Sequence, residues 1–233
     1  MKKIGIIGAM EEEVDQLKAK MTWVQVTTKA SMEFNEGKLA DRDVVVVRSG
    51  IGKVNAAICA QILVDDFGVD TIWNTGIAGS LKSEINIGDI VISTDALQHD
   101  MDATQFGYVR GQIPRMDTFS FPADETLIDL AVKCCGAVNP DIQVFRGRVV
   151  SGDQFVADAA RKTDIVDTFA GYCTEMEGAA IAQAAYLNKI PYVVIRAISD
   201  KADNSATMDY PTFEKQAIRH TVNLVEEMVK TIA

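Results

Sequence analysis

Hydrophobic positions along the chain fall into two kinds of segment. Short runs of apolar, β-branched residues indicate buried strands, and apolar side chains recurring every three or four residues indicate amphipathic helices. In the first helical pattern, Val14, Leu17 and Met21 form one stripe. Strands are predicted at 3–8, 43–50, 70–76, 89–94, 143–152 and 191–200, and helices at 13–21, at 52–67, after Asp158 and at 211–232.

The predicted strands are apolar on both faces, as in the run VVVV at 44–47. Such strands are covered by helices on both sides, and their alternation with helices is typical of a mainly parallel α/β sheet. Because no repeat, low-complexity segment or linker divides the sequence, one domain over 1–233 is expected. The stretch 95–125 has weak periodicity and predicts an excursion over the surface, and long excursions often carry function.

Composition narrows the class of protein. Hydrophobic residues make up 48% and charged residues 24% of the 233 residues, as in soluble globular proteins. The formal net charge of −10 argues against nucleic acid or anionic membranes as partners, since both need basic patches. Without a signal peptide or a run of ~18 apolar residues, a cytoplasmic protein is expected. The four cysteines and two histidines form no metal-binding motif and predict free, buried thiols.

Ligands of parallel α/β sheets bind at the carboxyl ends of the strands, where this chain pairs small residues with polar ones. The segments SGIGK (49–53) and NTGIAGS (74–80) follow two predicted strands. Each is equally consistent with a tight strand-to-helix turn, and neither matches the phosphate-binding G-x-x-x-x-G-K-[ST] loop. The glycines alone therefore identify no ligand.

Three glutamates stand where the first strand passes into a helix. Acidic residues are favoured at helix N-termini, so Glu11, Glu12 and Glu13 are each consistent with simple capping. At 100° per residue, however, Glu13 falls nearest the stripe of Met10 and Val14, while Glu12 points away from it. Glu13 is therefore the glutamate expected to reach a cleft.

Two further acidic positions follow predicted strands. Glu175 and Glu177 flank Met176 and share a face if the chain is extended there; Asp200 ends the apolar run VVIRAIS. Capping of the next helix is again the alternative for each. Glu13, Glu177 and Asp200 all fall at one rim of the sheet. A pair of carboxyl groups that acts on a glycosidic bond is therefore a second interpretation of these residues, beside helix capping.

The motifs of the chain also resemble a known family. They are IGIIGAMEEEV, SGIGKVNAA, NTGIAG, GDIVIS, FGYVRGQIP, VSGDQF, EMEGAAIA and VIRAISDKAD, in this order across residues 4–203. This set resembles the bacterial methylthioadenosine/S-adenosylhomocysteine nucleosidases of the nucleoside phosphorylase-like superfamily. The resemblance implies a three-layer αβα sandwich with a central, mostly parallel but mixed, twisted sheet. It also implies a homodimer that works without cofactor or metal.

The activity implied by the resemblance is hydrolysis of the adenine–ribose bond. The substrates would be methylthioadenosine, S-adenosylhomocysteine and 5′-deoxyadenosine, with a role in methionine salvage and the methyl cycle. By position, Glu13 activates the water, Asp200 protonates purine N7 and Glu177 binds the ribose hydroxyls. Burial of Asp200 would favour its neutral form, and the two glutamates would stabilise a cationic ribose.

The same resemblance implies a set of binding residues. Met176 lies under the ribose and base, Phe155 stacks on adenine, and the backbone of Val156 reads the adenine edge. The rest of the pocket is lined by Met10, Ile51, Ala78, Gly79, Arg196, Ser199 and Phe213. The partner subunit adds Ala103, Phe106, Tyr108 and Pro114 from the 95–125 excursion.

Two positions depart from the family pattern. Some members have serine where Ile77 stands, so a side-chain hydrogen bond is lost there. The position of Ala103 is often larger and apolar, which loosens the pocket around the sulfur substituent.

Two alternatives to hydrolysis stay open. A phosphate-dependent purine nucleoside phosphorylase on the same fold would need a cationic cradle, and phosphate would meet repulsion from the three glutamates; Arg48 and Arg196 could hold an anion elsewhere. A non-catalytic nucleoside-binding protein would need neither Glu13 nor Asp200.

Overall fold

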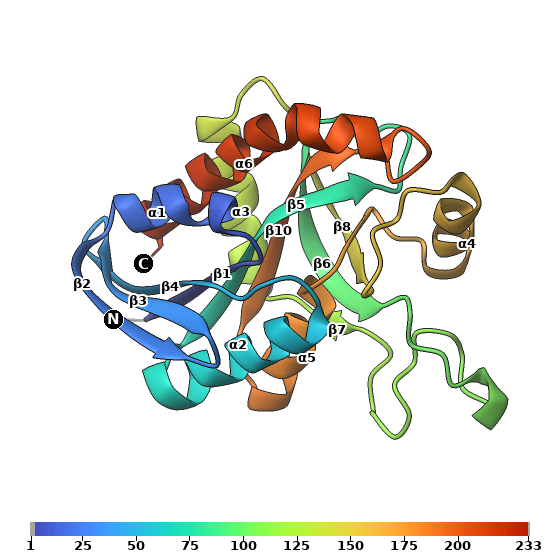
Figure 1. Ribbon diagram of the computed structural model, residues 1–233, viewed down its shortest axis with the longest axis horizontal. Coiled ribbons are helices and arrows are strands. Elements are labelled where there is room, and N and C mark those ends of the chain that lie inside the picture. The colour runs from blue at the N-terminus through green and yellow to red at the C-terminus, as the bar shows by residue number, and fades with distance from the viewer. Residues whose placement is uncertain (1–2, 233) are drawn as a thin grey trace.

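The protein folds around a ten-stranded mixed sheet with helices on both faces (Figure 1). The computed structural model describes residues 3–232. The strands are β1 (Ile4–Gly8), β2 (Thr22–Lys29), β3 (Met32–Leu39), β4 (Arg42–Arg48), β5 (Thr71–Ser80), β6 (Ile90–Gln98), β7 (Phe121–Pro122), β8 (Val144–Ser151), β9 (Cys173–Glu175) and β10 (Tyr192–Asp200). The helices are α1 (Asp15–Ala19), α2 (Lys53–Phe67), α3 (Glu125–Val138), α4 (Ala159–Phe169), α5 (Gly178–Asn188) and α6 (Ala206–Thr231), with short 3₁₀ turns η1 (Glu11–Glu13) and η2 (Thr104–Phe106).

Helices cover the sheet from two sides. Helices α1, α3 and α6 lie together on one face, and α2 and α5 pack against each other on the other (Figure 1). Strand β5 is buried along its whole length and Val44–Val47 of β4 are fully buried, as expected for strands covered on both faces. The predicted α/β fold class with helices on both sides of a mixed sheet is confirmed.

The strand order brings distant segments together. Strand β1 pairs in parallel with both β4 and β5, and β5 pairs in parallel with β10, so the carboxyl ends of these four strands meet at one edge. Strand β10 also pairs with β6, and the pairings β6–β8, β8–β9 and β9–β5 complete a closed ring of strands. The sequence did not predict this closure.

Several elements differ from the sequence prediction. The antiparallel hairpin β2–β3, helix α3 and the short strands β7 and β9 were not predicted. The helix predicted at 13–21 is a 3₁₀ turn followed by the short helix α1. Helix α6 begins at Ala206 rather than at 211, which places Pro211 inside the helix, where it cannot donate to the carbonyl of Thr207.

The predicted excursion is shorter than expected, because β6 continues to Gln98 and β7 begins at Phe121. The segment between them protrudes from the body of the molecule and carries η2 near its tip (Figure 1). Phe106 in this segment is 84% exposed. Within residues 3–232, no helix combines the length and the apolar character that a membrane crossing requires.

Candidate active site

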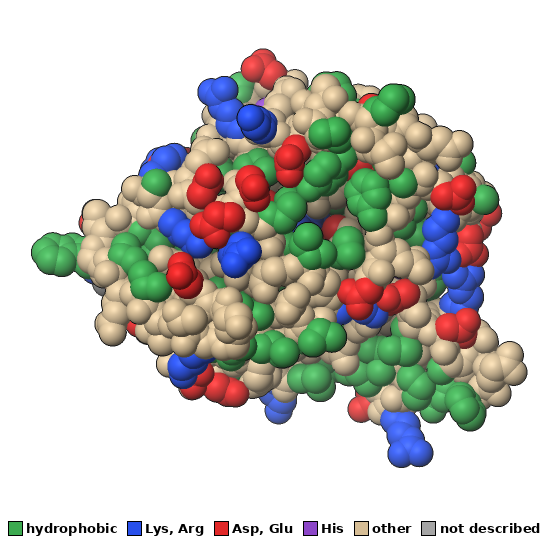
Figure 2. Space-filling model, in the orientation of Figure 1, with side chains coloured by type: hydrophobic (Ala, Val, Ile, Leu, Met, Phe, Trp, Pro, Cys, Tyr) green, Lys and Arg blue, Asp and Glu red, His purple; other side chains and the backbone are tan. Residues whose placement is uncertain are grey.

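The carboxyl ends of the strands open onto one cavity of about 510 Å³. Figure 2 shows it as a hollow near the middle of the displayed face, with hydrophobic side chains around it. The cavity is lined by Ala9, Met10, Glu13, Ile51, Ile77, Ala78, Gly79, Gln154, Phe155, Val156, Thr174, Glu175, Met176, Glu177, Ser199, Asp200, Thr207, Tyr210 and Pro211. Most of the wall is apolar, and the acidic side chains are few and buried, which is typical of a site that binds and orients a small organic molecule.

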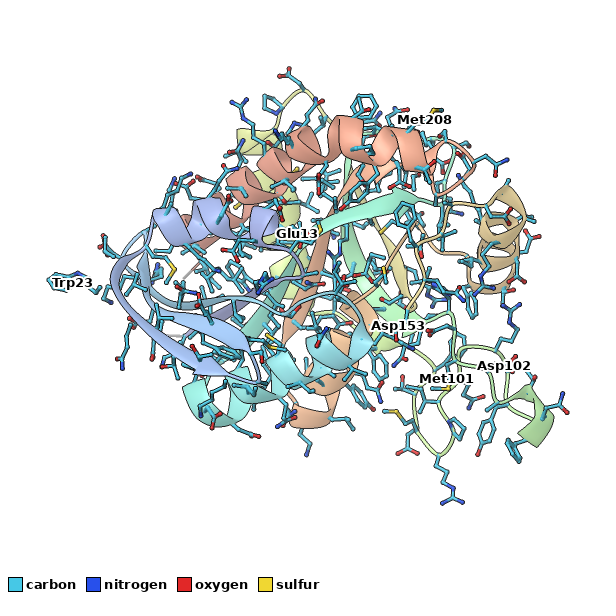
Figure 3. The ribbon with its side chains drawn as sticks, in the orientation of Figure 1. Glu13, Trp23, Met101, Asp102, Asp153 and Met208 are labelled. Carbon is cyan, nitrogen blue, oxygen red and sulfur yellow. The ribbon has the colours of Figure 1, made fainter. Side chains whose placement is uncertain are left out.

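Glu13 is the one member of its glutamate triplet that lies inside the protein (Figure 3). Its side chain is 2% exposed and turns back toward the strand ends, while Glu11 and Glu12 are exposed. One carboxylate oxygen accepts the N–H groups of Ala9 (2.7 Å) and Met10 (3.0 Å), and the other accepts that of Ile77 (3.1 Å). Burial raises the pKa of Glu13, opposed by the nearby Arg196 and by these backbone donors.

A second acidic group surrounds Arg196, which is fully buried in β10. The guanidinium donates to Asn74 Oδ1 (2.6 Å) and to the carboxylate of Glu175, and it lies 3.7 Å from Glu177 Oε2. Glu175 also accepts the hydroxyl of Ser151 and the N–H of Gly178 (2.7 Å). Arg196 is therefore held by two carboxylates of its own chain and is poorly placed to bind a free anion.

Glu177 is fixed from a third direction by the start of helix α2. The N–H of Gly52 donates to Glu177 Oε1 (2.9 Å), and the N–H of Lys53 donates to Asp153 Oδ1 (2.8 Å). Two carboxylates from distant parts of the chain thus cap the N-terminus of α2, which has no side-chain cap of its own. Gly52 has φ +97°, so the turn requires glycine there. Burial and the neighbouring Glu175 raise the pKa of Glu177.

Asp200 lies in the cavity at the end of β10 and is 2% exposed. Its oxygens accept the N–H of Ala202 (2.8 Å) and the hydroxyl of Ser199 (2.9 Å). Burial raises the pKa of Asp200 more than these donors lower it, so its neutral form is favoured relative to an aspartic acid in water. A Cβ at Gly79 would lie 2.8 Å from Asp200 Oδ1, which explains why glycine stands beside this carboxyl group.

Residues 3–230 match the model of the phosphorylase superfamily. A methylthioadenosine/S-adenosylhomocysteine nucleosidase of Bacillus thuringiensis is 41% identical over 231 residues, which is 99% of each chain. The chain belongs to this nucleosidase family.

Solved structures of nucleosidases in the family share the whole fold. The Neisseria meningitidis nucleosidase in complex with methylthio-immucillin-A matches with a TM-score of 0.95 and 37% identity, over 100% of both chains. The Colwellia psychrerythraea nucleosidase in complex with adenine matches with a TM-score of 0.94 and 39% identity, over 98% of this chain and 94% of that one. The resemblance read from the sequence motifs is therefore confirmed at the level of family and fold.

The structure of this nucleosidase gathers most of the residues selected from its sequence. The cavity wall includes Met10, Glu13, Ile51, Ala78, Gly79, Phe155, Val156, Met176, Glu177, Ser199 and Asp200. Arg196 lies behind the wall, in contact with Glu175 and Glu177. Ala103, Phe106, Tyr108 and Pro114 lie in the protruding segment and do not line the cavity of their own chain. In Figure 3, Met101 and Asp102 at the start of that segment lie at the lower right, away from Glu13 near the middle of the molecule.

Phe213 is not among the residues that line the cavity. Because α6 begins at Ala206, Thr207, Tyr210 and Pro211 share the helix face that borders the cavity, whereas Phe213 is rotated away from it. Tyr210 packs edge-on against Phe155, with ring centroids 5.8 Å apart. The helical spacing of these three residues would have identified the face, had the helix start been placed correctly. Glu175, which the sequence analysis noted beside Glu177 but did not select, lines the cavity and holds Arg196.

Proposed function

We propose that this nucleosidase hydrolyses the N-glycosidic bond of methylthioadenosine and S-adenosylhomocysteine, and of 5′-deoxyadenosine, releasing adenine. The observation that carries the proposal is that Glu13 and Asp200, from opposite ends of the chain, line one largely apolar cavity. Two carboxyl groups with separate environments can divide the acid and base roles that glycosidic hydrolysis needs. The names of the relatives, and their complexes with methylthio-immucillin-A and adenine, support the substrate class.

Asp200 is the proposed general acid. Adenine is a poor leaving group as an anion, so a proton must reach N7 as the bond to the sugar breaks. Burial keeps the carboxyl group of Asp200 neutral to a higher pH than in water, and Ser199 and the N–H of Ala202 fix both oxygens. An oriented carboxyl group whose pKa is raised by burial therefore faces the cavity before the substrate binds.

Glu13 is the proposed general base. Its two oxygens are held by three backbone N–H groups, which keep the carboxylate at the strand ends rather than in solvent. In this position it can take a proton from a water molecule that attacks the anomeric carbon. As the bond to adenine breaks, the sugar becomes cationic, and the carboxylates of Glu13 and Glu177 stabilise that charge more than they stabilise the neutral substrate.

The remaining wall residues fit the parts of a thionucleoside. We place the ribose over Met176, with its hydroxyls at Glu177, whose orientation is set by Gly52 and Arg196. We place adenine against the ring of Phe155, with its edge at the backbone of Val156 and close to Asp200. The 5′ substituent then extends toward Met10 and Ile51, where the wall is apolar and Ile51 is 55% exposed at the cavity mouth.

A phosphorylase reaction on the same fold fits the cavity less well. Among the described residues that line it, none is Lys, Arg or His, so a phosphate dianion would have no cationic partner there. Arg196, the nearest buried cation, is already held by Glu175 and Glu177. A phosphate about 4 Å from a carboxylate would be opposed by roughly 4 kcal/mol for each unit of its negative charge at intermediate dielectric. Water is therefore the favoured nucleophile.

We further propose that two copies of the chain form a homodimer in the cytoplasm. The protruding segment and the outer faces of α2 and α5 expose large apolar side chains, namely Val54, Ile58, Phe106, Val109, Tyr186 and Leu187. Exposed apolar surface of this kind is typical of protein interfaces. All four cysteines are free and buried, which supports a reducing compartment.

In this dimer, Tyr108 of one subunit is expected to complete the sulfur pocket of the other. Tyr108→Ala should raise KM for methylthioadenosine about tenfold, as expected for loss of a buried aromatic contact, with a smaller effect on 5′-deoxyadenosine, which lacks the sulfur substituent. Steady-state kinetics measures both. No change in KM for methylthioadenosine would show that Tyr108 lies elsewhere.

A mixing experiment shows which subunit the tyrosine serves. The Tyr108→Ala chain has an intact cavity, and a Glu13→Gln chain has an intact protruding segment. A mixed dimer therefore contains one complete site, and mixing the two variants is expected to restore the low KM in part. Failure to restore it, with mixed dimers demonstrated by mass, would mean that Tyr108 acts within its own chain.

The proposed activity is tested by timed release of adenine from methylthioadenosine, S-adenosylhomocysteine and 5′-deoxyadenosine in phosphate-free buffer. Turnover of the two thionucleosides is expected. A tight nucleoside complex without release of adenine would instead identify a binding protein.

A further inference from the structure

The wall formed by α6 contains a polar pair that the proposed reaction does not use. Thr207, Tyr210 and Pro211 face the cavity, and Glu214 follows on the same face of the helix. The hydroxyl of Tyr210 donates to Glu214 Oε1 at 3.1 Å, and it lies 3.3 Å from Met10 Sδ. One hydrogen bond thus places the carboxylate of Glu214 directly behind the cavity wall.

The acidic side chains near this pair differ in whether a basic side chain lies beside them. The carboxylate of Glu11 forms ion pairs with Lys18 at 2.8 Å and with Arg48 at 3.6 Å. Within residues 3–232, no basic nitrogen lies within 4.0 Å of the carboxylate of Glu214. Burial and the adjacent Glu214 both raise the pKa of Tyr210, so the hydroxyl stays protonated and remains a donor. The hydrogen bond from Tyr210 therefore holds the carboxylate of Glu214 close to the cavity.

The pair lies next to the wall assigned to the 5′ substituent. Tyr210 touches Met10 through its hydroxyl and packs against Phe155 through its ring edge, so it spans the space between the base and the cavity mouth. Glu177 and Asp200 are already assigned to the sugar and the base, respectively. A group carried on the 5′ sulfur would extend toward the mouth and meet the potential of Glu214.

We propose that Tyr210 and Glu214 set the charge selectivity for the 5′ substituent, favouring thioethers that carry an ammonium group over those that carry a carboxylate. This proposal rests on the proposed function. Tyr210 presents the carboxylate at a fixed place, and the wall excludes part of the solvent that would otherwise screen it. The effect acts on substrate binding and leaves the order of bond making and breaking unchanged.

The test compares two substrates of opposite charge, 5′-(2-aminoethylthio)-5′-deoxyadenosine and 5′-(carboxymethylthio)-5′-deoxyadenosine. The measured quantity is the ratio of kcat/KM for the amine to that for the acid, so that any general loss of activity cancels. In the unaltered protein this ratio is expected to be about ten. It should fall as salt is added, because salt screens the Coulomb interaction. A ratio of one or less at low salt overturns the proposal without involving any variant.

The variant Glu214→Gln is expected to lower the ratio about fivefold, since it removes the charge and keeps a hydrogen-bond acceptor for Tyr210. Glu227→Gln, on the same helix but several turns away, makes the same change in net charge and should leave the ratio as it was. An unchanged ratio in Glu214→Gln, or an equal fall in Glu227→Gln, contradicts the proposal. Absence of turnover with methylthioadenosine itself would instead contradict the proposed function.

Discussion

Replacing Glu13 with Gln is expected to lower kcat for methylthioadenosine by about 10³-fold, within the range that a positioned general base contributes. An amide cannot take the proton of the attacking water and carries no charge to stabilise the sugar cation. The comparison is best made with Glu11→Gln, which makes the same chemical change at an exposed glutamate of the same turn and should leave kcat unaltered. Steady-state release of adenine measures both.

The Glu13→Gln variant should remain folded. The amide oxygen can still accept the N–H groups of Ala9 and Met10, but its NH₂ group then faces the N–H of Ile77. Losing that one acceptor costs about 1–3 kcal/mol, which lowers the melting temperature without unfolding the protein. Circular dichroism and adenine binding check this point. Retention of activity within tenfold of the original would show that Glu13 is not the base.

Replacing Asp200 with Asn is expected to slow the release of adenine by about 10²–10⁴-fold, because an amide has no proton to transfer to N7. The loss should depend on the leaving group. A 4-nitrophenyl riboside releases 4-nitrophenolate, a stable anion that needs no proton, so its hydrolysis should fall much less, by about tenfold or under. Equal losses with both substrates would contradict the role of Asp200 as an acid.

The pH dependence of kcat provides a further check on Asp200. The acid works only while protonated, and burial raises its pKa above the usual value of 3.8. The rate should therefore fall as the pH rises through this elevated pKa, and the alkaline fall should be absent from the residual activity of Asp200→Asn. A variant that keeps the same alkaline fall would assign it to another group.

The sequence predicted those parts of the fold that depend on local pattern. The runs at 43–50 and 191–200 are continuous and apolar, and they became the buried strands β4 and β10. Strand β2 was missed because nearly all of its side chains are exposed and give no alternation of buried and polar positions. The ring formed by β5, β10, β6, β8 and β9 depends on pairings between distant segments, which no local pattern shows.

Site residues that follow a strand could be predicted from the sequence. A site residue on a helix could not, because the helix face that it occupies depends on where the helix begins. Glu13, Glu177 and Asp200 all follow strands, and the structure places them in one cavity. Tyr210 was passed over because Pro211 suggested a first helical position, whereas the helix begins five residues earlier, at Ala206. The contribution of Ala103, Phe106, Tyr108 and Pro114 to a neighbouring subunit remains a prediction, since it depends on a second chain.

The central claim is that carboxyl groups from distant parts of the chain direct water, and not phosphate, onto a single sugar–base bond. Analysis of the sugar product by ¹H and ³¹P NMR, with methylthioadenosine as substrate, with and without saturating phosphate, tests it most directly. Free methylthioribose, formed at the same rate with and without phosphate, is the predicted result. Formation of methylthioribose 1-phosphate, with a rate that depends on phosphate, would contradict it.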